Sequence, residues 1–226
     1  MSEYAYLIGD LILLALFGLL YLVRPQGRRA MRRTGLAMAP AGPLSEYWHT
    51  RDYWEPVHLL GWRVGHWRLG LEDLLFAFAF AGLSAGVFAW AAGARERAAP
   101  PVSSGGAHWG RAAFWVALLL ALLALGTDGA GWNSIYASMA SFAVLSAWFL
   151  RRNPRWLGPA LATGAVAALA MWAFYAGVFV PLFPGVLSRW WKLEALSGLA
   201  VLGVPVEEPA WAFFGGIFCG LLDPHL

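Results

Sequence analysis

The sequence predicts an all-α fold, a polytopic transmembrane helical bundle of six or seven helices in one integrated membrane domain, and three observations favour it. First, 60% of the 226 residues are hydrophobic and only 13% are charged, whereas soluble domains are about 45 to 50% apolar and about 25% charged. Second, the apolar residues form runs near the roughly 20 residues that cross a bilayer. Third, the basic residues form clusters between these runs, which is typical of topology signals rather than of a nucleic-acid surface.

Six apolar runs are clear candidates for spanning helices: residues 4–23, 71–92, 112–125, 132–150, 157–180 and 206–222. A weaker run at residues 34–47 contains Pro40 and Pro43. Because proline breaks or bends a helix, we expect a kinked seventh helix or a re-entrant segment there. The first run follows Glu3 and lacks the basic stretch of a signal peptide, so we interpret it as a retained helix.

The basic residues favour the seven-helix interpretation. If residues 34–47 cross the membrane, eleven of the 16 basic residues fall on one side and five on the other. Because basic residues concentrate on the cytoplasmic side, this arrangement predicts an outside N-terminus and a cytoplasmic C-terminus. The predicted localisation is therefore integral to a cell membrane, bacterial or archaeal.

The chain divides into two similar halves. Residues 94–110 are rich in Pro, Gly and Ser, and are expected to form a flexible inside loop between a first membrane repeat, residues 1–93, and a second, residues 111–226. In each half a helix is expected to open with an apolar residue, two acids, two variable positions, an aromatic residue, Ala and Phe. This shared pattern indicates an internal duplication with a site at the repeat interface.

The acidic pairs of this pattern, Glu72-Asp73 and Glu207-Glu208, are the candidate catalytic residues. Carboxylates also cap helix N-termini, and capping is the alternative interpretation. A doubled acid beside aromatic residues at membrane depth favours a functional site, because buried ionisable groups are costly there. Two close carboxylates in a dry site do not both ionise easily, so one is expected to hold a proton and serve as a general acid. Asp52, which precedes the first pair, is a further candidate.

Aromatic residues supply the expected substrate-binding surface, because ring faces attract a cation formed when an acid protonates an alkene. The candidates are Trp211, Phe213, Phe76, Phe78 and Trp54. Anchoring at the membrane interface is the alternative for each single ring. Asp10, inside the first apolar run, either lies at the interface or points into the bundle, and Glu46 shares the outer stretch that contains Asp52.

Other chemistries find little support in the sequence. Cys219 is the only cysteine, which excludes an intramolecular disulfide and a cysteine-cluster metal site. The five histidines lack the spacing of a zinc-protease helix, and the sequence has no glycine-rich phosphate loop, dinucleotide fingerprint or serine elbow. We therefore expect no metal, no cofactor and no nucleic-acid partner.

With these motifs, the sequence resembles the lycopene cyclase domain family of integral membrane carotenoid enzymes. In that family a Pro-x-Glu-Glu or Pro-x-Glu-Asp element followed by aromatic residues opens a transmembrane helix, and the domain occurs twice. The segment Pro205-Val206-Glu207-Glu208 matches this element, and Gly70-Leu71-Glu72-Asp73 matches it except that glycine replaces proline. The Trp-Asp element that family members carry ahead of each motif has no full counterpart here.

The resemblance implies a cofactor-free isomerase of carotenoid biosynthesis. In such an enzyme a carboxylic acid protonates the terminal double bond of an acyclic carotene, an internal double bond closes a six-membered ring, and a base removes a proton. Glu207, Glu208, Glu72 and Asp73 are then the acid and base candidates. The implied partners are membrane lipid and a hydrophobic isoprenoid or carotenoid, and a homo-oligomer or a membrane partner subunit stays open.

Three other functions stay open. A non-catalytic membrane protein that binds a carotenoid, another isoprenoid or a partner subunit uses its carboxylates as caps and interhelical links. A glutamate-dependent intramembrane protease requires an arginine after its double glutamate, where this chain has Ala77 and Ala212. A transporter has repeats as well, but of inverted topology, whereas these repeats run parallel.

Overall fold

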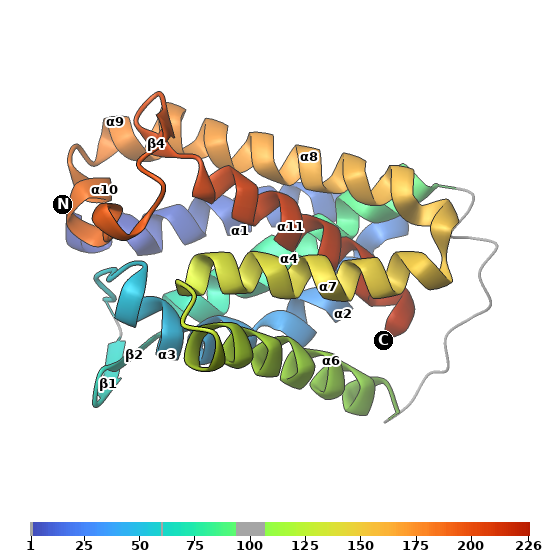
Figure 1. The fold of residues 1–226 in the computed structure, drawn as a ribbon. Helices are drawn as coiled ribbons and strands as arrows, with labels where there is room; N and C mark the ends of the chain where they lie inside the picture. Colours follow the sequence, from blue (N-terminus) through green and yellow to red (C-terminus); the bar gives the residue numbers. More distant parts are fainter. Residues whose placement is uncertain (1, 60, 94–106) are drawn as a thin grey trace.

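The computed structural model describes residues 2–59, 61–93 and 107–226, which form a predominantly helical bundle (Figure 1). The α-helices are α1 (Ala5–Val23), α2 (Arg28–Met38), α3 (Ala41–Asp52), α4 (Leu71–Ala92), α6 (Ala107–Ala124), α7 (Ser134–Arg152), α8 (Leu157–Phe174), α9 (Val180–Leu182), α10 (Val186–Trp190) and α11 (Glu207–Leu222). Single 3-10 turns are η1 (Ser2–Tyr4), η2 (Pro25–Gly27), η4 (Pro154–Trp156), η6 (Leu193–Ala195) and η7 (Asp223–His225).

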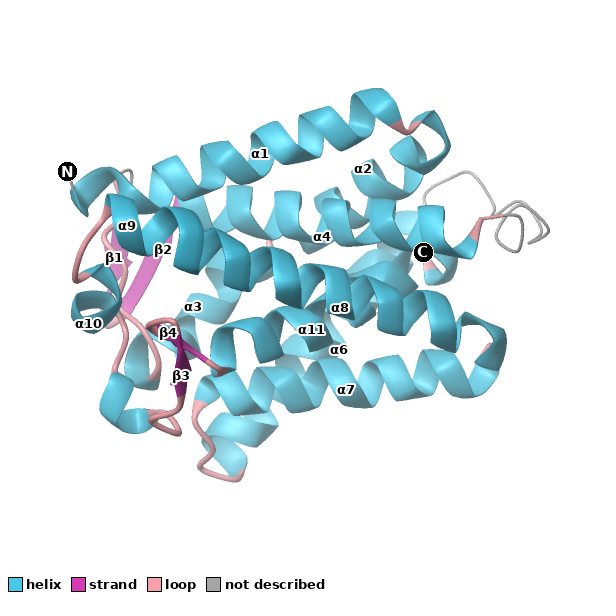
Figure 2. Ribbon diagram, turned by 90° about the horizontal axis from the view of Figure 1, so that it is seen from above, coloured by secondary structure: helices cyan, strands magenta, loops and turns pink. Residues whose placement is uncertain are grey.

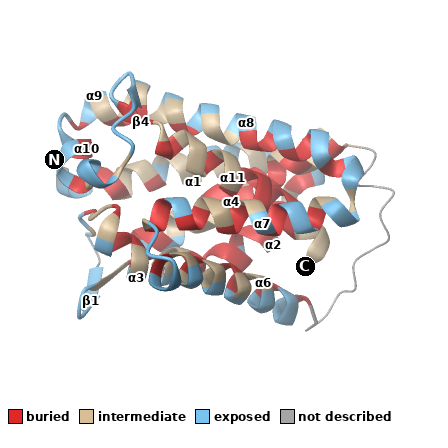
Figure 3. Ribbon diagram, in the orientation of Figure 1, coloured by how far each residue is buried: buried red, intermediate tan, exposed pale blue. Residues whose placement is uncertain are grey.

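Four segments of the described chain are long and apolar enough to cross a membrane: Ala5–Val23, Leu71–Ala92, His108–Gly129 and Pro154–Leu182. Their length meets the roughly 20 residues that the hydrocarbon core requires. Helices α7 and α11 lie alongside them, and α11 packs against α4, α7 and α8 in the interior, where Figure 3 shows many of the buried residues. The prediction of a helical membrane protein is confirmed.

The two ends of the bundle differ in what they hold. Figures 1 and 2 show the N-terminus, α10 and four short strands at one end, and the C-terminal end of α11 toward the other. Helices α4 and α11 both begin at the end with the strands. Both acidic pairs, which occupy the first turns of these helices, therefore lie at that end.

Two predicted segment boundaries change. The weak run at residues 34–47 is divided between α2 and α3, with the break at Ala39 and Pro40, because Pro40 and Pro43 lack the N–H that a continuous helix needs. Most of the predicted loop at residues 94–110 lies outside the described residues. Its last part is helical, since α6 begins at Ala107.

Two helix pairs pack through glycine. A Cβ atom on Gly35 of α2 would lie 2.9 Å from the Phe78 carbonyl oxygen of α4. A Cβ atom on Gly164 of α8 would lie 2.8 Å from the Phe213 carbonyl oxygen of α11. Small residues permit this close approach of backbones, which is typical of helix contacts in membranes.

A β-hairpin precedes each acidic pair. Strands β1 (Gly61–Val64) and β2 (Trp67–Gly70) are antiparallel and end where α4 begins. Strands β3 (Ala200–Val201) and β4 (Val204–Pro205) are also antiparallel and end just before α11. Gly65 and Gly203 adopt positive φ angles of 64° and 78° in the two turns, which glycine does at little cost. The helical pattern of the sequence did not predict these hairpins.

Helices α6 and α8 each continue into a π-helical turn. These are η3 (Leu125–Gly129), which follows α6, and η5 (Tyr175–Phe179), which continues α8 into α9. In η5 both Tyr175 and Phe179 are buried, and their rings contact each other at 5.4 Å between centroids. The π turn thus brings two aromatic side chains, four positions apart, into one aromatic cluster.

Candidate functional site

A mainly apolar cavity of about 510 Å³ lies among α1, α3, α4, α8 and α11. Its lining follows α1 from Tyr6 to Val23, roughly 25 Å at 1.5 Å per residue. Four carboxylates line it, and each is at most 4% exposed: Asp10, Glu46, Asp73 and Glu208. The cavity is therefore long and apolar, with a small number of buried acids.

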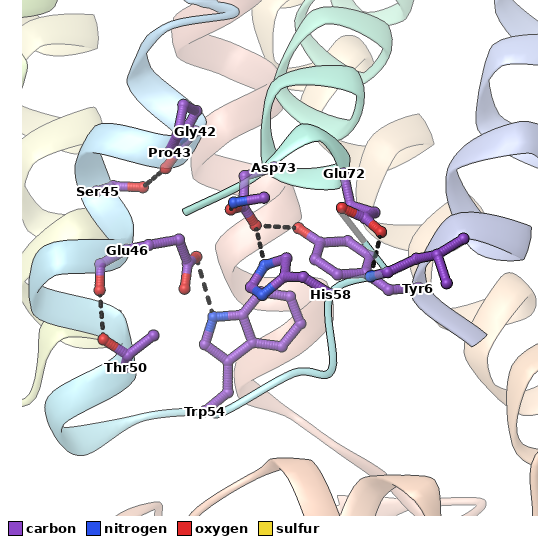
Figure 4. A network of polar contacts seen from close by, with 12 residues as sticks. Tyr6, Gly42, Pro43, Ser45, Glu46, Thr50, Trp54, His58, Glu72 and Asp73 are labelled. Atoms are coloured by element: carbon purple, nitrogen blue, oxygen red, sulfur yellow. Dashed lines mark hydrogen bonds and ion pairs between the residues drawn. The ribbon is translucent and has the colours of Figure 1, made fainter. Parts of the chain in front are cut away.

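The two side chains of the first acidic pair have different hydrogen-bond partners. Glu72 accepts a hydrogen bond of 2.7 Å from the backbone N–H of Leu59 and does not line the cavity. Asp73 lines it and accepts hydrogen bonds from the Tyr6 hydroxyl at 2.9 Å and the Gly70 backbone N–H at 2.8 Å. The His58 Nε2 atom lies 3.0 Å from the same carboxylate, as Figure 4 shows.

The two side chains of the second acidic pair also have different hydrogen-bond partners. Glu207 accepts hydrogen bonds of 2.8 Å from the backbone N–H of Ser197 and from the Tyr136 hydroxyl, and does not line the cavity. Glu208 lines it and accepts hydrogen bonds from the Trp191 indole at 2.6 Å and from the Tyr53 hydroxyl. Successive residues of a helix point about 100° apart, so one acid of each pair contacts the preceding loop and the other contacts the cavity.

Two further carboxylates reach the cavity from α1 and α3. Glu46 accepts a hydrogen bond of 3.1 Å from the Trp54 indole, and its second oxygen has no partner. Figure 4 shows Glu46 beside the Asp73 network. Asp10 is 1% exposed, and its Oδ2 atom has no hydrogen-bond partner. The salt bridges formed among the described residues include neither of these two acids.

Aromatic rings connect the two halves of the site. Trp54 contacts Tyr6 at 5.3 Å and Trp191 at 5.2 Å between ring centroids, so rings extend from the partners of Asp73 to those of Glu208. Trp211 of α11 contacts Phe76 and Phe80 of α4 at 5.9 Å and 5.2 Å. These π faces give a cation formed in the cavity a favourable surface.

Three of the predicted aromatic residues, Trp211, Phe76 and Trp54, line the cavity. Phe78 and Phe213 do not; they contact the glycines where α2 meets α4 and α8 meets α11.

The predicted candidate Asp52 also lies away from the cavity lining. Its carboxylate accepts hydrogen bonds from the Ser134 hydroxyl at 2.6 Å and from the Ser134 backbone N–H, at the start of α7. Asn133 is the N-cap of that helix, because its side chain accepts a hydrogen bond from the Ile135 N–H. Asp52 therefore stabilises a helix terminus in this structure.

Sequence reasoning missed several polar partners of the acids. Tyr6, Tyr53, His58 and Trp191 all contact Asp73 or Glu208. Only Tyr6 carries a sequence signal: it precedes Asp10 by four residues, and such residues share one face of a helix. Within the described residues, no group of three or more His, Cys, Asp and Glu side chains could hold a metal ion.

The fold and the site together define a helical membrane protein with an elongated apolar cavity and buried carboxylates. The family model for lycopene cyclase matches residues 133–226. Over these residues, which make up less than half of the chain, the sequence is similar to the lycopene cyclase family. The matched part contains α7 to α11 with Glu207 and Glu208. No curated protein and no solved structure matches the chain.

Proposed function

We propose that this protein is a membrane cyclase that closes a ring at one end of an acyclic carotene or a related isoprenoid. The observation that carries the proposal is the elongated apolar cavity lined by Asp73, Glu208 and a continuous set of aromatic rings. The lycopene cyclase family match of residues 133–226 supports it independently.

The shape of the cavity suits a long apolar chain. Its lining on α1 and α8 consists mainly of Leu, Ala, Val and Phe side chains, and the acids lie toward the N-terminal end of α1. A polyene therefore places one end group at the carboxylates and its remaining length along α1 and α8. Most of α1 is not buried within the protein, so lipid reaches this helix directly and supplies such a substrate.

The chemistry requires an acid, a base and protection of a cation from water. An acid adds a proton to the terminal double bond, the neighbouring double bond attacks the cation and closes the ring, and a base removes a proton. The second acid of each pair, Asp73 or Glu208, lines the cavity and is the better acid or base candidate. The rings of Trp54, Trp191 and Trp211 stabilise the cation, and the apolar walls exclude water.

We also propose that the membrane domain arose by tandem duplication, and three observations support this. Each acidic pair follows a β-hairpin. In each pair the first acid accepts a bond from a preceding backbone N–H, and the second accepts one from a tyrosine hydroxyl. The matching positions Phe78 and Phe213 each contact a glycine of a neighbouring helix. The proposed catalytic site lies where the two halves meet.

We infer the orientation from the charges. Arg28 begins α2, Arg111 follows the start of α6 by four residues, and Arg152 ends α7. These three helix ends lie at the end of the bundle opposite the acidic pairs (Figure 1). Basic residues favour the cytoplasmic side, so the acidic end faces outward and the C-terminus faces the cytoplasm.

Expression in bacteria that accumulate lycopene tests the function. We expect chromatography of the extracted pigments to show a new carotene of the same mass with one or two rings. Protein content of the membrane fraction is measured by immunoblot in parallel. Unchanged lycopene in cells whose membranes contain the protein contradicts the proposal.

Non-catalytic carotenoid binding is a second candidate, because Asp73 and Glu208 each accept several hydrogen bonds, as structural carboxylates do. Under this alternative the purified protein retains pigment without any change in pigment composition. The same expression experiment distinguishes the two functions.

A further inference from the structure

Asp10 is the least satisfied carboxylate of the cavity. It lies in α1, a helix of 19 residues, and its side chain is buried against the cavity lining. No described residue donates a hydrogen bond to its Oδ2 atom. An unpaired carboxylate anion is very costly in an apolar membrane interior. The structure gives Asp10 no capping or ion-pairing role that accounts for its burial.

Asp10, Asp73 and Tyr6 all line the same cavity. Tyr6 and Asp10 are four residues apart and share one face of α1. The Tyr6 hydroxyl donates a hydrogen bond to Asp73 at 2.9 Å. Two carboxyl groups in one dry cavity favour a state in which one of them holds a proton.

The partners of the two acids decide which one holds that proton. Asp73 accepts from the Tyr6 hydroxyl and the Gly70 N–H, and His58 lies at hydrogen-bond distance. Several donors stabilise a carboxylate anion. No described residue donates a hydrogen bond to the buried Asp10 Oδ2 atom, so the neutral acid is favoured there.

We propose that Asp10, which belongs to neither acidic pair, is the proton donor of the cyclisation, and that Asp73 is the proton acceptor. This inference rests on the proposed function. It assigns the donor to α1, outside the segment that matches the lycopene cyclase family model.

The proposed steps balance in protons and electrons. The Asp10 O–H bond breaks, its proton forms a C–H bond at the terminal double bond, and a tertiary cation results. The next double bond donates its electron pair to form the ring C–C bond. A ring C–H bond then breaks, its electrons form the ring double bond, and Asp73 takes the proton. Return of that proton from Asp73 to Asp10 restores the starting state, so no co-reactant is consumed.

The test compares Asp10→Asn with Asp73→Asn in lycopene-accumulating cells grown in deuterated water. We expect Asp10→Asn to lower ring formation by at least about 100-fold, the usual size of a general-acid effect. Lycopene recovered from this variant is expected to contain no more deuterium than lycopene from cells that lack the protein. Asp73→Asn also blocks ring formation, but its recovered lycopene carries additional deuterium at the end groups, because protonation still occurs and reverses. Ser146→Ala, which changes a buried hydroxyl outside the cavity, is the matched control and keeps wild-type activity.

A second variant separates chemistry from folding. Asp10→Glu keeps the carboxylic acid and is expected to restore ring formation to within about tenfold of wild type, whereas Asp10→Asn at equal membrane abundance does not. If Asp10→Asn is missing from the membrane, the Asp10→Glu and Asp10→Ser variants are compared instead, and equal activity of these two overturns the inference. Wild-type activity of Asp10→Asn overturns it while the proposed function stands. A wild-type protein that forms no ring overturns both.

Discussion

The two acidic pairs are held by the same kinds of donors, yet their surroundings differ. Around Asp73 lie two more carboxylates, Asp10 and Glu46, whereas the direct partners of Glu208 are the Tyr53 hydroxyl and the Trp191 indole. The family match covers Glu208 and Trp191 but excludes Tyr53, α1 and α4. The segment that is easiest to recognise is thus not the one richest in acids.

This difference suggests a division of labour on the proposed function. Proton donation and acceptance concentrate on the first half, where Asp10, Glu46 and Asp73 line the cavity. The second half contributes aromatic faces, which favour a positive charge, and the carboxyl group of Glu208, which also lines the cavity. Four predictions test this comparison, from the largest expected effect to the smallest.

Amide substitutions distinguish the second acid of each pair, which lines the cavity, from the first acid, which contacts the preceding loop. We expect Asp73→Asn and Glu208→Gln to lower ring formation by about 100-fold or more, because the amides neither transfer a proton nor carry the charge. Glu72→Gln and Glu207→Gln are expected to stay within about tenfold, since their carboxylates contact loops rather than the cavity. Pigment chromatography, normalised to membrane abundance, gives the comparison. A larger loss for Glu72→Gln than for Asp73→Asn reverses our assignment.

Glycine contacts test whether the two halves are built alike. Gly35→Ala and Gly164→Ala each place a methyl group against a backbone oxygen, so each is expected to cost about 1–3 kcal/mol of stability, as overpacking does. Thermal denaturation of the purified protein in detergent measures the loss. Gly158→Ala, on α8 with open space around it, is the control. A large effect at only one of the two glycines argues against equivalent halves.

Two aromatic residues of α11 separate cavity lining from helix packing. Trp211→Leu removes a ring that contacts Phe76 and Phe80 in the cavity, and we expect about a tenfold loss of ring formation, the size of a cation–π contact of 1–2 kcal/mol. Phe213→Leu changes a ring outside the cavity, and activity per folded protein is expected to change less than threefold, about 0.6 kcal/mol. Equal losses in the two variants mean that Trp211 acts through packing.

The smallest effect concerns pH and the opposite end of the bundle. Burial, with a smaller contribution from Arg152, lowers the pKa of His225 to about 4, and its ring stacks on Phe149. An unfolded histidine has a pKa of about 6.5. Between these values the unfolded state binds more protons, so stability falls as the pH decreases from about 6.5 to 4.

Replacing His225 with Gln is expected to flatten this part of the stability profile and to leave ring formation at neutral pH unchanged. Denaturation temperatures at several pH values measure the slope. An unaltered slope shows that other groups cause the pH dependence.

The sequence predicted the features that depend on local patterns. Apolar runs located the long helices, of which four described segments are candidate spans, and the doubled acids located the first turns of α4 and α11. The convergence of Asp10, Glu46 and Asp73 was not predictable, because they come from three helices and meet only through tertiary packing. For the same reason, sequence spacing alone placed Asp52 and Phe213 at the site. In the structure, Asp52 accepts a hydrogen bond from Ser134 at the start of α7, and Phe213 contacts Gly164.

The π-helical turn η5 sets the rotational phase of α9, the short helix that follows it. A π turn accommodates one extra residue, and each residue of an α-helix advances the direction of its side chain by about 100°. Deleting one residue between Tyr175 and Phe179 is therefore expected to convert the turn to α-helix and to keep the side chains of α9 in their present orientation. A deletion elsewhere in α8 rotates Tyr175 and Phe179 away from the cavity that they line. Tolerance to shortening is thus confined to one turn of this helix.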